Sequence, residues 1–221
     1  MHRKKIKPKA PIEIRSLNKY THYLEDVTQL SFSSHSGSLV INSRRMINLD
    51  KVVDNLKIDV KSTDAIHYNF LENKLYLVEF KNGSILEKED EKEFSCHLEA
   101  PSCKVKKNAR KLKNEEIKAN LALKGVDTFL IVLKNILNVE EYKMICEKKV
   151  KLNYVIVNTK PKEGTIGNLR KQNRLETLSN LNSIGELIPS IFKRYEGVIF
   201  DKIIFTDEVY FEQYLLDMIL G

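Results

Sequence analysis

Two carboxylates and a lysine stand at a spacing that suits metal-assisted chemistry. Asp64 is followed, after fourteen intervening residues, by Glu79, Phe80 and Lys81. Carboxylate oxygens are hard ligands of the kind that Mg²⁺ prefers, and Mg²⁺ usually keeps coordination sites for water and phosphate. A lysine about 7 Å further along the same face of a strand could reach that water or a phosphate. The pattern predicts a divalent metal held by Asp64 and Glu79, with Lys81 beside it.

The stretch 64–81 reads as a β-hairpin that would bring these groups together. Alternating apolar residues over 66–70 predict one strand, and the apolar run over 75–80 predicts a second strand after a polar turn. Period-2 geometry then puts Glu79 and Lys81 on one face. Because Glu79 stands where the core should continue, its carboxylate needs a partner such as a metal ion. An edge hairpin with a surface Glu and Lys pair fits the same residues.

The arrangement Asp64, then Glu79-Phe80-Lys81, resembles the Asp…Glu-x-Lys signature of the PD-(D/E)xK nuclease superfamily. The resemblance covers one hairpin and, more loosely, the elements around it. The proline that usually precedes the Asp is Thr63 here. The resemblance implies a restriction endonuclease-like α/β fold, with a central mixed β-sheet flanked by helices, and a metal-dependent nuclease that hydrolyses phosphodiester bonds in nucleic acid, with DNA expected.

The same resemblance implies a role for each residue of the hairpin. Asp64 and Glu79 would hold Mg²⁺, for which Mn²⁺ can substitute, and the backbone carbonyl of Phe80 would complete the coordination. Lys81 would orient the attacking water, help to deprotonate it, or neutralise developing negative charge. These roles describe an Mg²⁺-dependent (endo)nuclease.

A further acid is expected from the element before the sheet. Apolar residues at helical spacing predict a helix over 16–30. In the resembling family such a helix often contributes an acidic residue to the metal site, and Glu25 is preferred here over Asp26. A solvated helical acid is the alternative for Glu25.

Other acids compete with Asp64 for the metal. Asp50, Asp54 and Asp59 precede it, and Asp59 is the main rival because it also precedes a β-like stretch. Asp64 is preferred because it adjoins the longer apolar strand and has the family-like separation from Glu79.

Basic residues indicate a polyanionic partner. The formal net charge is +7 and the isoelectric point is near 9.1. The start of the long helix predicted over 108–137 follows a basic cluster, and the resemblance implies that this cluster lies near the site. It also implies that a lysine further along that helix, Lys118 or alternatively Lys124, projects towards the site. A solvated helical face is the competing interpretation of this cluster. The proposed phosphate contacts are Lys106, Lys107, Arg110, Lys111 and Lys118.

The 221 residues are expected to form one domain. Residues 1–15 read as a flexible basic arm and 16–221 as a single nuclease-like α/β domain, with a charged insertion near 84–104. Gly125 would kink or interrupt the long helix. Further elements are expected as a strand over 151–158, a mostly helical stretch over 168–195, a strand over 198–205 and a closing helix over 209–220. Cys96, His97 and Cys103 lack the paired spacing of a zinc site.

The sequence carries no apolar run of the length that a membrane span needs, and its three cysteines form no dense framework. We therefore expect a soluble, cytoplasmic protein with no membrane partner, and leave homodimerisation open. The alternative function is a catalytically inactive nuclease-fold protein that binds nucleic acid or a protein partner as a regulator or assembly factor. A protein-interaction module with an incidental basic surface is a third hypothesis.

Overall fold

The computed structural model describes residues 13–34, 36–81, 104–159 and 190–221, and for 104–111, 113, 114 and 190 the backbone alone. Several expectations lie outside these described residues. They are the basic arm up to residue 12, the insertion up to residue 103 with Cys96, His97 and Cys103, the helical stretch up to residue 189, and the side chains of Lys106, Lys107, Arg110 and Lys111.

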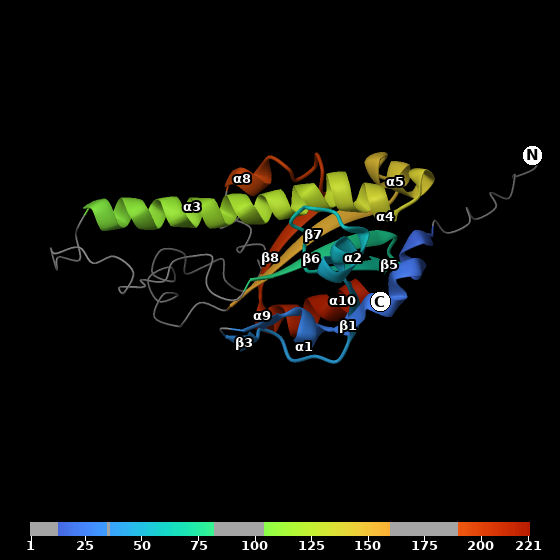
Figure 1. Cartoon of the computed structure of the whole chain (residues 1–221), viewed down its shortest axis with the longest axis horizontal. Helices are drawn as coiled ribbons and strands as arrows, with labels where there is room; N and C mark the ends of the chain where they lie inside the picture. Colours follow the sequence, from blue (N-terminus) through green and yellow to red (C-terminus); the bar gives the residue numbers. More distant parts are fainter. Residues whose placement is uncertain (1–12, 35, 82–103, 160–189) are drawn as a thin grey trace, which may run out of the picture.

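A six-stranded mixed sheet forms the centre of the protein (Figure 1). Its strand order is β1-β4-β5-β6-β7-β8, antiparallel from β1 to β6 and parallel from β6 to β8. The strands are β1 (Leu24–Asp26), β4 (Arg45–Asn48), β5 (Ala65–Asn69), β6 (Lys74–Lys81), β7 (Lys151–Asn158) and β8 (Lys202–Asp207). A separate two-stranded ribbon joins β2 (Phe32–Ser33) to β3 (Gly37–Ser38).

Helices cover both faces of this sheet, which confirms the predicted α/β class (Figure 1). One face is covered by η1 (Ser16–Tyr23), α2 (Leu49–Leu56), α3 (Lys104–Asp127), η2 (Thr128–Leu133), α4 (Lys134–Ile136), α5 (Val139–Cys146) and α8 (Ser190–Lys193). The other face is covered by α1 (Val27–Leu30), α9 (Glu208–Tyr210), η3 (Phe211–Leu215) and α10 (Leu216–Leu220). None of the helices in the described ranges has the length and apolar character that a bilayer crossing requires.

The predicted hairpin is β5 and β6, and β6 divides the two cores. Leu75 and Leu77 pack in the core under α3, whereas Tyr76 and Val78 pack in the core under α10. All four side chains are fully buried, as the alternation of an apolar strand predicts. Glu79 continues the face of Leu75 and Leu77, so its carboxylate points into the layer that contains α3.

The helix predicted over 16–30 is wrong. The chain instead forms the 3₁₀ helix η1, the short strand β1 and the short helix α1. Pairing of β1 with β4, in which Glu25 lies opposite Met46, overrides the local helical spacing. Glu25 therefore lies on an edge strand of the sheet and not on a helix.

The long helix and the strand after it follow the prediction closely. Helical backbone runs from α3 through η2 to α4, and α3 continues through Gly125 without a break. The next strand, β7, is parallel to β6, as expected for a helical crossover. The strand predicted over 198–205 is shifted to Lys202–Asp207, and the closing helix is present as α9, η3 and α10.

Candidate active site

Asp64 and Glu79 lie side by side where β5 begins and β6 ends. The register pairs Ala65 with Val78, and one further step places Asp64 opposite Glu79. The backbone N–H of Phe80 donates to Asp64 Oδ2 at 2.6 Å, which fixes the orientation of that carboxylate. The Glu79 side chain is 4% exposed and that of Asp64 is 17% exposed. The hairpin thus brings both predicted carboxylates together in a nearly buried position.

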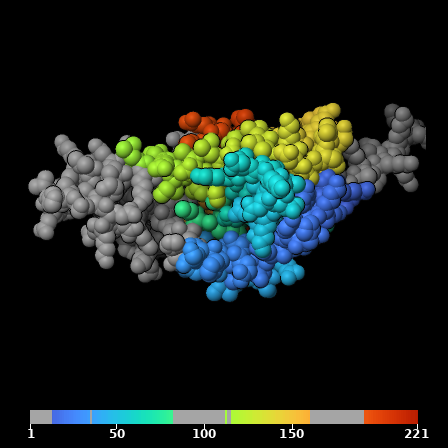
Figure 2. All heavy atoms as spheres, in the orientation of Figure 1, coloured from blue at the N-terminus to red at the C-terminus, as the bar shows by residue number. Residues whose placement is uncertain are grey.

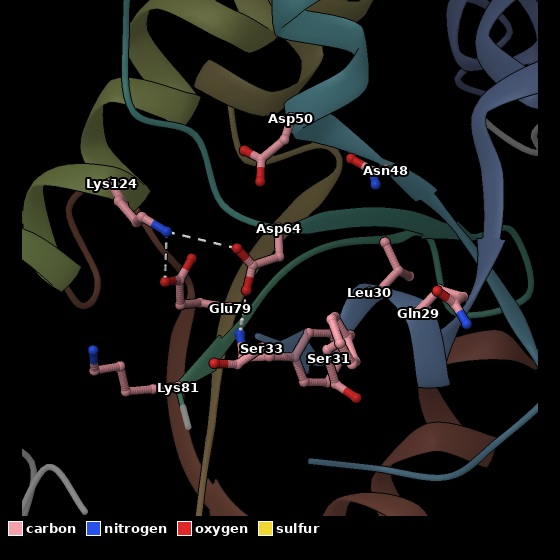
Figure 3. Close-up of a pocket in the computed structure, with 12 residues that line it drawn as sticks. Gln29, Leu30, Ser31, Ser33, Asn48, Asp50, Asp64, Glu79, Lys81 and Lys124 are labelled. Carbon is pink, nitrogen blue, oxygen red and sulfur yellow. Dashed lines mark hydrogen bonds and ion pairs between the residues drawn. The ribbon is translucent and has the colours of Figure 1, made fainter. Parts of the chain in front are cut away.

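Lys124, from α3, faces both carboxylates (Figure 3). Its Nζ donates to Glu79 Oε1 at 2.7 Å and lies 3.6 Å from Asp64 Oδ1. Lys118, the other lysine considered for this position, instead pairs with Glu115 at 3.1 Å and is not among the pocket residues. The structure therefore selects Lys124 as the helix lysine of this site.

Burial and nearby negative charge make both acids weak. Burial raises the pKa of Glu79, and the charge of Asp64 raises it further, to about 8, against the opposing effect of Lys124. Burial likewise raises the pKa of Asp64 to about 6, although Lys124 and the Phe80 N–H oppose this. Burial alone would lower the pKa of Lys124, but the two carboxylates outweigh it, so that pKa lies above its usual value. Two carboxylates in one buried place are incompletely neutralised by one lysine.

One oxygen of the pair has no partner in the described part of the chain. Glu79 Oε2 is buried and makes no hydrogen bond there, although buried polar atoms are normally satisfied. The same carboxylate lines a pocket of about 410 Å³. Figure 2 shows the hairpin residues reaching the surface between α3, α2 and the segment that contains α1. The pocket is lined by Gln29, Leu30, Ser31, Phe32, Ser33, Asn48, Asp50, Asp64, Glu79, Phe80, Lys81 and Lys124.

Asp50 is a third acid at this pocket. Asn48 caps α2 by accepting a bond from the Lys51 N–H, which places Asp50 in the first turn, where the helix dipole favours an acid. Ser62 Oγ donates to Asp50 Oδ1 at 2.7 Å. From the sequence, Asp50 is expected only as a competitor of Asp64. The signal in the sequence was an acid shortly after an Asn that can cap a helix. That helix, α2, lies between β4 and the hairpin in the chain.

Thr128 ties the segment just before β5, which carries Asp64, to the helix that carries Lys124. The buried hydroxyl of Thr128 donates to the carbonyl of Lys124 at 2.7 Å and accepts the backbone N–H of Thr63 at 2.9 Å. A proline at position 63, as in the resembling nucleases, could not donate this bond. Thr128 also begins η2, a π-helical turn, and such turns are frequent at functional sites.

Gly125 allows α3 to approach the sheet closely next to Lys124. A Cβ at this position would lie 2.7 Å from Cε1 and 2.9 Å from Cδ1 of Tyr154 on β7. The Tyr154 hydroxyl in turn donates to the carbonyl of Leu121 at 2.9 Å. The glycine expected to kink the helix therefore serves close packing, and this packing sets the depth of Lys124.

Lys81 and Glu25 have different positions relative to the pocket. Lys81 is half-buried at the end of β6 and lines the pocket. Glu25 is not among the lining residues. It forms an ion pair with Lys51 and accepts a bond from Asn48 Nδ2 at 2.7 Å. The structure does not bring Glu25 to the carboxylate pair. Asn48 links them indirectly, because it donates to Glu25 and also lines the pocket.

The carboxylate pair fits a magnesium ion that keeps much of its water. Within the described ranges, no three or more His, Cys, Asp or Glu side chains are grouped so that they could hold a metal ion by themselves. Mg²⁺, however, is commonly bound through one or two carboxylates, with waters and substrate phosphates as its other ligands. A cation bound to the carboxylate pair would relieve the repulsion between Glu79 and Asp64.

Comparisons with family models, curated proteins and solved structures find no match to this chain. What the site does is therefore inferred from its own residues and their geometry.

Proposed function

We propose that this protein is an Mg²⁺-dependent nuclease of restriction endonuclease-like fold that hydrolyses phosphodiester bonds in nucleic acid, with DNA as the expected substrate. The observation that carries the proposal is the buried pair of Asp64 and Glu79 at a polar pocket, with one oxygen that has no partner among the described residues. Such a pair costs folding free energy, because burial and like charge both disfavour the ionised acids. Perturbed acids that line a pocket are characteristic of functional sites.

Five residues of the pocket have a role in this proposal. Asp64 and Glu79 would hold the ion, with the backbone carbonyl of Phe80 as a further ligand. A bound Mg²⁺ lowers the pKa of water and stabilises negative charge on a phosphate. Lys81 would orient the attacking water or help to deprotonate it. Lys124 neutralises part of the negative charge of the carboxylates in the absence of metal, and its own charge favours binding of a phosphate nearby.

Affinity for nucleic acid would come from the basic residues of α3. Lys106, Lys107, Arg110 and Lys111 lie on the same helix as Lys124, nearer its amino end. Contacts between such side chains and phosphates give affinity that falls as the salt concentration rises, with no dependence on base sequence. We further propose that the enzyme is cytoplasmic and able to act as a homodimer.

A second candidate function is binding without catalysis. Lys124 already pairs with Glu79 and lies close to Asp64, so part of the negative charge is neutralised without a metal. A protein that relied on this ion pair alone would keep the fold and bind nucleic acid or a protein partner as a regulator or assembly factor.

Cleavage assays with matched lysine variants separate the two functions. We expect the parent protein to cut linear DNA, circular DNA or RNA in Mg²⁺ or Mn²⁺ but not in EDTA. Lys81→Ala should lower kcat by about 10²- to 10⁴-fold, the range for loss of a general acid or base. Lys74→Ala is the control, because Lys74 begins the same strand and pairs with Glu72 away from the pocket. A parent protein that binds DNA tightly but cuts none of these substrates would support the second function.

A further inference from the structure

Phe32 is an exposed aromatic residue in the lining of the catalytic pocket. The residue is 59% exposed, and it lines the pocket together with Asp64 and Glu79. A single exposed apolar residue is common on protein surfaces. Phe32 differs because most other residues around this pocket are polar or charged. An aromatic face beside groups proposed to act on a phosphate calls for a ligand that has both a phosphate and an aromatic ring.

The ribbon that carries Phe32 is anchored to the protein. Ser31, which precedes it, is buried, and its hydroxyl both donates to the Val40 carbonyl at 3.1 Å and accepts the Val40 N–H at 3.0 Å. The Leu39 N–H donates to the Ser31 carbonyl at 3.1 Å, and Phe32 itself pairs with Ser38. In Figure 3 the labelled residues of this segment lie across the pocket from Lys124. These bonds therefore hold the backbone at Phe32 in place.

We propose that Phe32 stacks on a nucleobase next to the phosphate that Asp64 and Glu79 act on, so that the enzyme's substrate has an unpaired nucleotide at the cut. The inference rests on the proposed nuclease function and adds its substrate class. Inside a duplex both faces of a base are covered by neighbouring bases, so an aromatic side chain can stack on a base only where the strand is single or opened. A pocket of about 410 Å³ is small among ligand sites and suits one nucleotide.

The test compares Phe32 variants on substrates that differ in one base. Binding of a fluorescent single-stranded oligonucleotide is followed by anisotropy in EDTA, and kcat and KM for its cleavage are measured in Mn²⁺. A second oligonucleotide has an abasic residue at the cut site, which keeps the sugar and the phosphates but lacks the nucleobase. A third substrate is the blunt duplex. Phe70→Ala is the matched control, because Phe70 is 44% exposed but lies at the hairpin turn and is not among the pocket residues.

We expect Phe32→Ala to weaken binding and raise KM by about 5- to 150-fold on the normal single strand, the effect of truncating an aromatic stacking residue. The same variant should have little effect on the abasic strand, since the ring that Phe32 would contact is missing. Phe32→Trp should retain parent-like KM, and Phe70→Ala should match the parent on every substrate. The blunt duplex should be cut more slowly than the single strand.

The remaining outcomes overturn the inference. If the parent protein cuts nucleic acid and Phe32→Ala matches it on the normal strand, the stacking role is wrong while the nuclease function stands. The inference also fails if Phe32→Ala and Phe70→Ala lose activity equally, or if the parent cuts blunt duplex as fast as single strand. A parent protein that neither binds nor cuts any of the substrates overturns both the inference and the proposed function.

Discussion

Lys124 on α3 and Glu79 on β6, 45 residues apart in the chain, form an ion pair with a distance of 2.7 Å between Nζ and Oε1. The same ammonium lies 3.6 Å from Asp64 Oδ1, so one positive charge faces two carboxylates. This charge stabilises the acids when no metal is bound, and it repels a divalent cation that approaches them. Lys124 therefore links the stability of the metal-free protein to its affinity for metal.

Replacing Lys124 should separate these two effects. In EDTA at pH 8, we expect Lys124→Met to lower the free energy of unfolding by about 1–3 kcal/mol, less than for a fully buried pair because Lys124 is 26% exposed. The stabilisation by Mn²⁺ should become larger than in the parent, since the repulsion is gone. Lys118→Met is the control and should change stability by less than about 0.5 kcal/mol, because its i,i+3 partner Glu115 is 58% exposed and water screens the pair. Thermal unfolding with and without Mn²⁺ measures both quantities, and an unaltered Mn²⁺ effect would contradict this role of Lys124.

The raised pKa values predict that the metal-free protein loses stability as the pH rises. The folded state holds protons on Glu79 up to a pKa of about 8 and on Asp64 up to about 6, whereas the unfolded chain releases them near 4.5 and 3.8. Because the folded state binds more protons, the contribution is full below about pH 4 and falls as the pH rises towards 8. Urea unfolding in EDTA at several pH values measures this slope.

Glu79→Gln should flatten that slope, since the variant cannot ionise at this position. The parent slope should also weaken or reverse in Mn²⁺, because metal ligands bind best when they are deprotonated. The stability in EDTA could instead rise between pH 5 and pH 8, by the same amount in the parent and in Glu79→Gln. That result would mean that the pKa values of the pair are not raised.

Thr128 offers a test of how the site is held together. Thr128→Val keeps the shape but leaves the buried Thr63 N–H without its acceptor, which should cost about 1–3 kcal/mol of stability. The segments that carry Asp64 and Lys124 would also lose the hydroxyl that links them, so we expect kcat for cleavage to fall. Thr128→Ser keeps the hydroxyl and should restore most of kcat. If Ser and Val variants have the same kcat at equal stability, the hydroxyl does not position the site.

Gly125 tests the close approach of α3 to the sheet. The added Cβ of Gly125→Ala would clash with the Tyr154 ring, and overpacking typically costs about 1–3 kcal/mol, reduced here by about 1 kcal/mol from the better helix propensity of alanine. Tyr154→Leu removes the ring and should make Gly125→Ala less costly in the double variant than in the parent. Additive effects in chemical denaturation would show that the two residues are uncoupled.

The hairpin could be predicted because its signals are local. Alternation over 66–70 and the apolar run over 75–80 specify which faces are buried, and the short turn fixes the register that brings Asp64 to Glu79. The helical periodicity after residue 115 similarly predicted a long helix followed by a buried strand. Each of these patterns depends on residues close together in the sequence.

The parts that could not be predicted depend on contacts between distant segments. Local spacing around Glu25 is helical, but pairing of β1 with β4 makes this segment a strand. The choice between Lys118 and Lys124 depends on the depth and rotation of α3 on the sheet, which Gly125 and Tyr154 set from two different elements. Thr128 appears in the sequence as a polar interruption near an apolar stripe, and its two bonds become evident only in the fold.

The central claim is that Asp64 and Glu79 form a metal site, and a buried glutamate elsewhere supplies a control for it. Burial pulls the pKa of Glu141 upward, but bonds from Ser16, Arg15 and Asn138 outweigh this and hold it below its usual value. Glu141→Gln should therefore destabilise the protein. Glu79→Gln removes a charge from a repelling pair and should leave the protein as stable as the parent, or more stable, in EDTA at pH 8.

The most direct measurement is the melting temperature of the parent, Glu79→Gln and Glu141→Gln with EDTA and with Mn²⁺. At about 100 times its Kd, Mn²⁺ bound only to the folded state should raise the melting temperature by about 5–10 °C. We expect this rise in the parent and in Glu141→Gln, and its loss in Glu79→Gln. A rise of the same size in Glu79→Gln, or none in the parent, would contradict a metal site at Asp64 and Glu79.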